Sequence, residues 1–146
     1  MIKYLTRVFG LSLLLLSDAG AESNLNPRVD LAAAVNVCAG VHYEDCVVRQ
    51  FKDTLEASLI RGRQVFKTYC VLCHGSEGLG DGRAASLHNP PPFNLTKSVA
   101  PRDYINRIIR IGGAGMGRGK AMPPWNEQLT YEQIEDTLNY LESIRK

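Results

Sequence analysis

Cys70-Val71-Leu72-Cys73-His74 is the stretch of sequence that decides the fold. Two cysteines three positions apart, followed at once by a histidine, are typical of covalent haem attachment, in which each sulfur forms a thioether with a haem vinyl group. One helical turn presents Cys70 and Cys73 to one edge of the porphyrin, and His74 then reaches the iron. The motif therefore predicts a cofactor that carries the chemistry, while the protein binds and tunes it.

Three other interpretations of the motif stay open. A Cys-x-x-Cys pair is also a thioredoxin-like redox motif, which is expected in a cytosolic α/β protein. A zinc site would need a second pair of ligands at similar spacing, and none follows Cys73. The five-residue pattern could also arise by chance.

The N-terminus has the features of a secretory signal. Lys3 and Arg7 accompany a short apolar run over residues 8–16, and Ala19-Gly20-Ala21 supplies the small residues of a signal-peptidase site. Because the run is short for a membrane span, we expect residues 1–21 to be a cleavable signal peptide, with an uncleaved anchor as the alternative. Export to the periplasm would place the cysteines where disulfides are permitted.

The composition is that of a soluble globular protein of 146 residues, with 45% hydrophobic and 22% charged side chains. Loss of Lys3, Arg7 and Asp18 with the signal leaves 15 basic and 14 acidic residues, a balance that excludes a nucleic-acid binder. The charges are nevertheless uneven, because residues 102–120 are mostly basic and residues 127–142 mostly acidic. They either orient a partner or are simply solvated helix faces.

The apolar residues from Val47 to Tyr69 recur at spacings of three and four, which predicts a helix. Gly62 lies inside this stretch, where it either breaks the helix or allows another element to pack closely. Before it, residues 22–36 are expected to be a loose leader with a short helical turn over residues 31–35.

Two further helices are expected nearer the C-terminus. One follows Pro101 and is stopped by Gly112-Gly113. The last begins at Thr130, where Gln133 completes a capping box. No strand pattern is present, so the sequence predicts an all-α fold of three or four helices with long loops wrapped around a haem.

Cys38 and Cys46 lie outside the haem motif. In an exported protein the simplest expectation is that they form a disulfide. Free thiols or an intermolecular bond are the alternatives.

The second axial ligand of the iron is expected to be a methionine. Met122 is followed by Pro123-Pro124, which stiffen the loop, whereas Met116 lies between two glycines and is the less favoured candidate. A methionine sulfur favours Fe(II) and raises the reduction potential. His42 and His88 are rival ligands that we expect to be surface histidines instead.

The sequence resembles a class I c-type cytochrome, the monohaem cytochrome c family, over about residues 58–146. The matching segments are Gly62-Arg63-Gln64-Val65-Phe66, Cys70-Val71-Leu72-Cys73-His74-Gly75, Ile111-Gly112, Met122-Pro123-Pro124-Trp125, Leu129-Thr130 and Asn139-Tyr140-Leu141. The resemblance implies one haem c, linked through Cys70 and Cys73 and ligated by His74 and Met122.

The resemblance also implies roles for the surrounding residues. Gly62 and Phe66 would lie where the first helix of the cytochrome fold crosses the helix of Tyr140. One of the prolines in Pro90-Pro91-Pro92 would accept a hydrogen bond from His74 through its carbonyl. Trp125 would pack beside a haem propionate or simply belong to the core.

These features together predict an exported, soluble, monomeric monohaem electron carrier, at most peripheral to a membrane. It would pass one electron from a dehydrogenase or respiratory complex to an oxidase or reductase, and it would not be an enzyme. Residues 22–57 would be an N-terminal extension and residues 58–146 the cytochrome domain. The alternative function is a haem subunit or sensor whose sixth ligand is displaced by a small gas or by peroxide.

Overall fold

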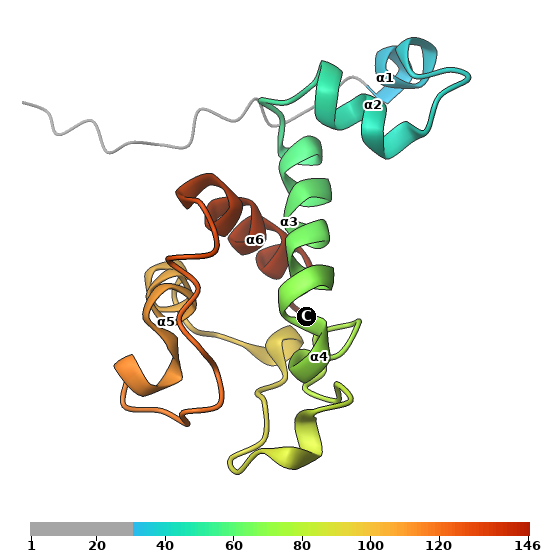
Figure 1. Cartoon of the computed structure of the whole chain (residues 1–146). Coiled ribbons are helices and arrows are strands. Elements are labelled where there is room, and N and C mark those ends of the chain that lie inside the picture. Colours follow the sequence, from blue (N-terminus) through green and yellow to red (C-terminus); the bar gives the residue numbers. More distant parts are fainter. Residues whose placement is uncertain (1–30) are drawn as a thin grey trace, which may run out of the picture.

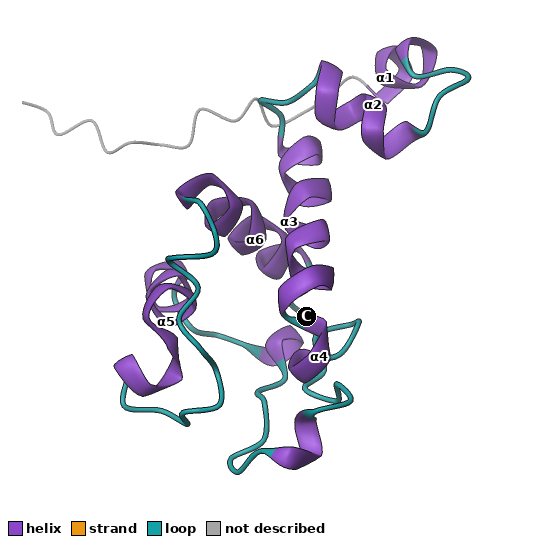
Figure 2. Cartoon of the chain, viewed as in Figure 1, coloured by secondary structure: helices purple, strands orange, loops and turns teal. Residues whose placement is uncertain are grey.

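Helices joined by long loops make up the part of the protein that the computed structural model describes, residues 31–146 (Figures 1 and 2). The expected signal peptide, residues 1–21, lies outside these residues. No strand occurs between residues 31 and 146, which confirms the all-α class. The α-helices are α1 (Leu31–Val37), α2 (Tyr43–Gln50), α3 (Leu55–Tyr69), α4 (Val71–His74), α5 (Arg102–Gly115) and α6 (Tyr131–Ser143), and two 3₁₀ turns are η1 (Ala85–Leu87) and η2 (Leu95–Lys97).

The helix that the sequence predicts from Val47 to Tyr69 is two helices in the structure. α2 ends at Gln50 and α3 begins at Leu55. The break has a local cause, because the hydroxyl of Thr54 accepts a hydrogen bond from the Ala57 amide at 3.3 Å and so caps the N-terminus of α3.

α3 and α6 cross at Gly62, and α3 runs through this glycine without a break (Figure 1). A Cβ atom at Gly62 would overlap the carbonyl oxygen of Asp136 in α6. Of the two explanations for this glycine, close packing is therefore correct. Four residues further along α3, the rings of Phe66 and Tyr140 lie with their centroids 5.4 Å apart.

A buried polar network joins the same two helices. The Asp136 carboxylate, in a residue only 4% exposed, accepts hydrogen bonds from Ser58 at 2.5 Å and from Arg61 at 2.7 and 3.0 Å. Asn139 donates to the Ser58 hydroxyl at 2.8 Å, and Arg61 also donates to the Lys52 carbonyl at 2.9 Å. The network thus links α6 to α3 and to the connection before α3.

The main core lies between α3, α5 and α6. It is formed by side chains that are less than a tenth exposed: Val65, Phe66, Ile105, Ile109, Leu129, Ile134, Leu138 and Leu141. α6 begins at the expected place, because Thr130 and Gln133 form the predicted capping box.

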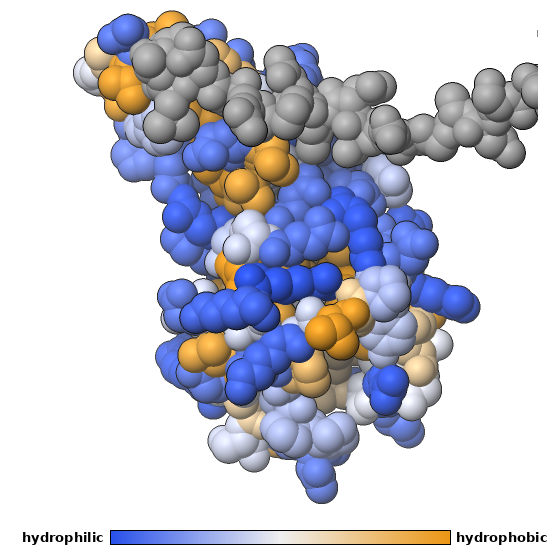
Figure 3. Space-filling view, turned by 180° about the vertical axis from the view of Figure 1, so that it is seen from behind, coloured by the Kyte–Doolittle hydropathy of each residue, from blue (hydrophilic) through white to orange (hydrophobic). Residues whose placement is uncertain are grey.

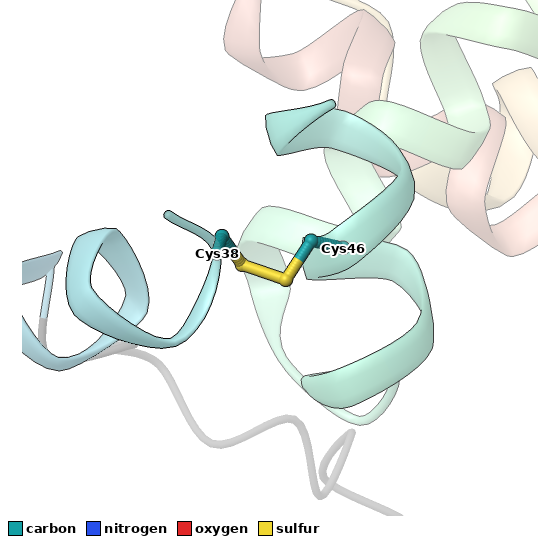
Figure 4. The surroundings of a disulfide bond; sticks show 2 residues. All are labelled: Cys38 and Cys46. Atoms are coloured by element: carbon teal, nitrogen blue, oxygen red, sulfur yellow. A yellow bond between two sulfur atoms is a disulfide. The ribbon is translucent and has the colours of Figure 1, made fainter. Parts of the chain in front are cut away.

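The N-terminal extension has more structure than the short helical turn that the sequence predicts. α1 and α2 are joined by a disulfide between Cys38 and Cys46, with an S–S distance of 2.00 Å (Figure 4). A second, smaller core packs this pair of helices against α3; its buried members are Cys38, Cys46, Val47, Ala57 and Ile60. None of the helices in residues 31–146 is long and apolar enough to cross a lipid bilayer.

Candidate functional site

The motif Cys70–His74 forms a tight turn directly after α3. Cys70 ends α3 and precedes α4, and its carbonyl accepts hydrogen bonds from the amides of Cys73 at 3.2 Å and His74 at 2.9 Å. Neither thiol is in a disulfide, and both residues are half-buried. One turn of helix therefore spans the two cysteines and the histidine.

The loop after the motif is fastened to it by backbone hydrogen bonds of 2.8 to 3.1 Å. The amides of Gly80, Gly82 and Ala84 donate to the carbonyls of His74, Cys73 and Leu72 respectively. These bonds fix the motif from the outside without using its side chains, which stay free for a cofactor.

The His74 ring is oriented by a backbone carbonyl, but not by the one that the sequence predicts. Its Nδ1 lies 3.2 Å from the carbonyl oxygen of Phe93, to which it donates, so the expectation that a carbonyl within residues 90–92 serves is wrong. The reason is the anchor of this loop, because the Leu95 amide donates to the Gly78 carbonyl at 2.7 Å and brings residue 93 against the imidazole. Nε2 of His74 is then the nitrogen available to a metal.

The protonation of these groups follows from their burial. Burial and, to a smaller extent, the neighbouring Cys73 together raise the pKa of the Cys70 thiol to about 12. Burial also lowers the pKa of His74, against the smaller opposite effect of its bond to Phe93, which favours the neutral imidazole that binds metals. A thiol with a raised pKa is the opposite of the activated cysteine of thioredoxin-like enzymes.

Met122 and Cys70 both pack against the main core, and both are half-buried. Met116 is half-buried at the C-terminal end of α5, but it is not among the residues packed against that core. The structure therefore brings Met122, rather than Met116, to the core that also supports the cysteine motif.

The two rival histidines differ in their surroundings. The His42 side chain is 72% exposed in the extension, as expected of a surface residue. His88 is half-buried, with Nε2 4.0 Å from the sulfur of Cys73, so it is closer to the motif than the sequence predicts. Trp125 packs on the main core, edge-on to Tyr69 with the ring centroids 5.3 Å apart.

The donor set suits haem c. Covalent attachment requires two thiols at this spacing, and the iron requires two ligands. The chain offers two cysteines outside any disulfide, an imidazole with Nδ1 already engaged and a thioether on the same core. Among residues 31–146, no three His, Cys, Asp or Glu side chains are grouped closely enough to hold a metal ion.

Residues 57–141 match the family described as cytochrome c oxidase, cbb3-type, subunit III. The chain belongs to this family of c-type cytochromes. Membership of this family implies a covalently bound haem c.

Individual relatives match different shares of the cytochrome. The cbb3-type cytochrome c oxidase subunit FixP of Sinorhizobium medicae (strain WSM419) is 28% identical over 131 residues, which are 86% of this chain and 45% of FixP. Cytochrome c6 of Porphyra purpurea is 30% identical over 96 residues, 66% of this chain and 80% of that protein. Cytochrome c6 of Pyropia tenera is 32% identical over 85 residues, 58% of this chain and 91% of that protein.

A solved structure has a similar fold. A chain of the Kuenenia stuttgartiensis reducing HAO-like protein complex Kustc0457/Kustc0458 matches 58% of the cytochrome with a TM-score of 0.50 and 32% identity. The match covers 41% of the Kuenenia chain. The cytochrome therefore spans less than half the length of the Kuenenia chain and less than half the length of FixP.

Proposed function

We propose that the protein is an exported, monohaem electron carrier that takes one electron from a dehydrogenase or respiratory complex and passes it to an oxidase or reductase. It makes and breaks no bond in a substrate and is therefore not an enzyme. Bound haem c supplies a one-electron Fe(III)/Fe(II) couple. The chain's own contribution is to hold this group, to set its ligands and to present one edge to partners.

Four side chains carry the proposed site. Cys70 and Cys73 would hold the haem through thioethers, and Nε2 of His74 and the sulfur of Met122 would be the two protein ligands of its iron. The observation that carries the proposal is the bond from Nδ1 of His74 to the Phe93 carbonyl, because it leaves Nε2 for the iron. The position of Met122 on the core that also supports Cys70 adds to it.

An optical spectrum recorded during a redox titration of the mature protein tests the ligand set. We expect a sulfur-to-iron charge-transfer band in the oxidised state, and Met122→Ala abolishes this band and lowers the potential because the soft ligand is lost. Met116→Ala is the matched control and leaves the band in place. A band that survives in Met122→Ala and disappears in Met116→Ala would transfer the ligand role to Met116.

Two simpler measurements separate the electron carrier from the other functions. The reduced wild-type protein is expected not to bind carbon monoxide, because both axial positions are filled; ready binding would favour the sensor with a displaceable ligand. A denaturing gel stained for haem peroxidase activity is expected to show a covalent haem band. A gel without that band would contradict covalent attachment.

The surface charges support a partner with an acidic docking face. Four of the acidic residues after position 126 are held in ion pairs. Glu135 and Glu142 each lie 2.8 Å from Arg102, and Asp136 and Glu132 lie 2.7 and 3.8 Å from Arg61. The face in Figure 3 is covered mainly by hydrophilic side chains, with apolar residues in small separate groups on the main body. A small, polar and salt-sensitive interface suits rapid turnover of an electron carrier.

A further inference from the structure

We propose that Gly112 and Gly113 are positioning residues that seat Met122 and so set the strength of the distal bond. The inference rests on the proposed ligation by Met122 and concerns the part of the chain that holds its sulfur in place. Its first support is an interruption of α5 at Gly112, where φ is 73° and ψ is 171°. Glycine adopts this conformation without strain, whereas a residue with a side chain does not.

The interruption exchanges hydrogen bonds of the helix for bonds to the methionine segment. In an unbroken helix the Gly113 amide would donate to the Ile109 carbonyl. Here the Gly113 amide donates to the Met122 carbonyl at 2.9 Å, and the Ile109 carbonyl accepts from the Trp125 amide at 3.0 Å. Two backbone hydrogen bonds therefore clamp the chain on either side of Pro123-Pro124, with Met122 at one end.

Residues 119–124 lie so close to α5 that there is no room for a side chain at Gly112 or Gly113. A Cβ atom at Gly112 would lie 2.8 Å from the nitrogen of Pro124 and 2.9 Å from the carbonyl oxygen of Met122. A Cβ atom at Gly113 would overlap the carbonyl oxygen of Gly119. These neighbours are backbone atoms, which cannot rotate away, so any side chain at either glycine pushes residues 119–124 off α5.

The consequence falls on Met122 because the displaced segment carries it. Its backbone is bonded to α5 through the carbonyl and followed by two prolines, so the sulfur has little freedom to compensate for a shift of its own backbone. A misplaced ligand weakens its bond while the rest of the fold persists.

Holocytochrome variants Gly112→Ala and Gly113→Ala test the inference. We expect the sulfur-to-iron charge-transfer band to weaken or disappear, the potential to fall, and added imidazole to replace the sulfur with an affinity raised at least about tenfold, equivalent to about 1.4 kcal/mol. Gly117→Ala is the matched control. It lies in the same loop with φ 65° and has nothing within 4 Å of its Cβ position, so it adds backbone strain without touching residues 119–124. It is expected to destabilise the fold and leave band, potential and imidazole affinity unchanged.

If Gly112→Ala and Gly113→Ala lose stability like Gly117→Ala but keep the wild-type band, potential and imidazole affinity, the inference is overturned. Loss of the band in Met122→Ala with its retention in both glycine variants overturns this inference alone, whereas retention of the band in Met122→Ala overturns the proposed ligation.

A measurement on the wild-type holocytochrome covers variants that fail to fold. Displacement of Met122 by imidazole is expected to speed hydrogen exchange of the Gly113 and Trp125 amides, because the clamp and the distal bond support each other. Exchange rates that imidazole leaves unchanged would show that the clamp does not act on the ligand.

Discussion

At the scale of the residue, Gly62 sets the distance between α3 and α6. An alanine there gains about 1 kcal/mol of helix propensity. It also adds a methyl group that overlaps the Asp136 carbonyl oxygen. Overpacking of this kind against backbone costs about 3 kcal/mol. The second effect is larger, so we expect Gly62→Ala to lower the free energy of unfolding by about 2 kcal/mol, measured by urea denaturation of the holocytochrome.

Gln64→Ala is the control for this substitution, because Gln64 is exposed on the same helix. It is expected to stay within about 0.5 kcal/mol of the wild type. Equal stability of Gly62→Ala and Gln64→Ala would mean that the two helices can separate without loss.

At the scale of the element, the crossing of α3 and α6 depends on the carboxylate of Asp136. Asp136→Asn keeps the side-chain shape but removes the charge that faces Arg61, whose own pKa is raised by this bond. The Arg61 side chain is 22% exposed and can partly regain water, so the loss is expected to be about 2 kcal/mol rather than that of a fully buried pair. A double-mutant cycle with Arg61→Gln, followed by urea denaturation, is expected to give a coupling of similar size. Additive losses would show that the carboxylate acts through Ser58 instead.

The pair α1 and α2 depends on its disulfide in a different way. The Cys38–Cys46 bond closes a loop of sequence separation 8, which in the chain-entropy model stabilises by about 2.5 kcal/mol. We expect Cys38→Ala/Cys46→Ala to speed hydrogen exchange in residues 31–50 and to leave the optical spectrum of the haem unchanged. A changed spectrum would instead show that the extension supports the haem site.

The elements also show where sequence reasoning succeeds and where it stops. The cap of α6 and the close packing at Gly62 could be predicted because the Thr130 box and a glycine inside a helix are local signals, whereas the Thr54 cap that separates α3 from α2 was not predicted. The hydrogen bond from His74 to the Phe93 carbonyl could not be predicted, because it depends on how a long loop is anchored at Gly78. The hydrogen bonds that hold the Met122 segment could not be predicted either. Gly112-Gly113 predicts the end of a helix, but it does not show which segment bonds to the Gly113 amide and the Ile109 carbonyl.

At the scale of the whole molecule, only part of the basic stretch is neutralised by the ion pairs that join Arg102 to α6. Arg107 and Lys120 are exposed cations on the basic stretch of residues 102–120, and neither is in an ion pair among the described residues. Lys120 lies two residues from Met122, so this stretch adjoins the proposed haem site. Exposed cations there raise the rate of encounter with an acidic partner, and salt screens the effect.

Reversal of these two charges gives the sharpest test of docking. Arg107→Glu/Lys120→Glu is expected to slow electron transfer to an acidic redox protein about tenfold at low salt, and the difference should vanish at high salt. The control Arg49→Glu/Lys52→Glu changes the net charge by the same amount on exposed residues of the extension. These residues precede α3, whereas the cysteine motif follows the opposite end of this helix (Figure 1). Stopped-flow rates over a range of ionic strength compare the two. Net charge changes alike in both variants, so a docking surface beside Met122 predicts slower electron transfer in Arg107→Glu/Lys120→Glu than in the control. Equal slowing of the two variants would mean that the partner responds to the total charge and not to this surface.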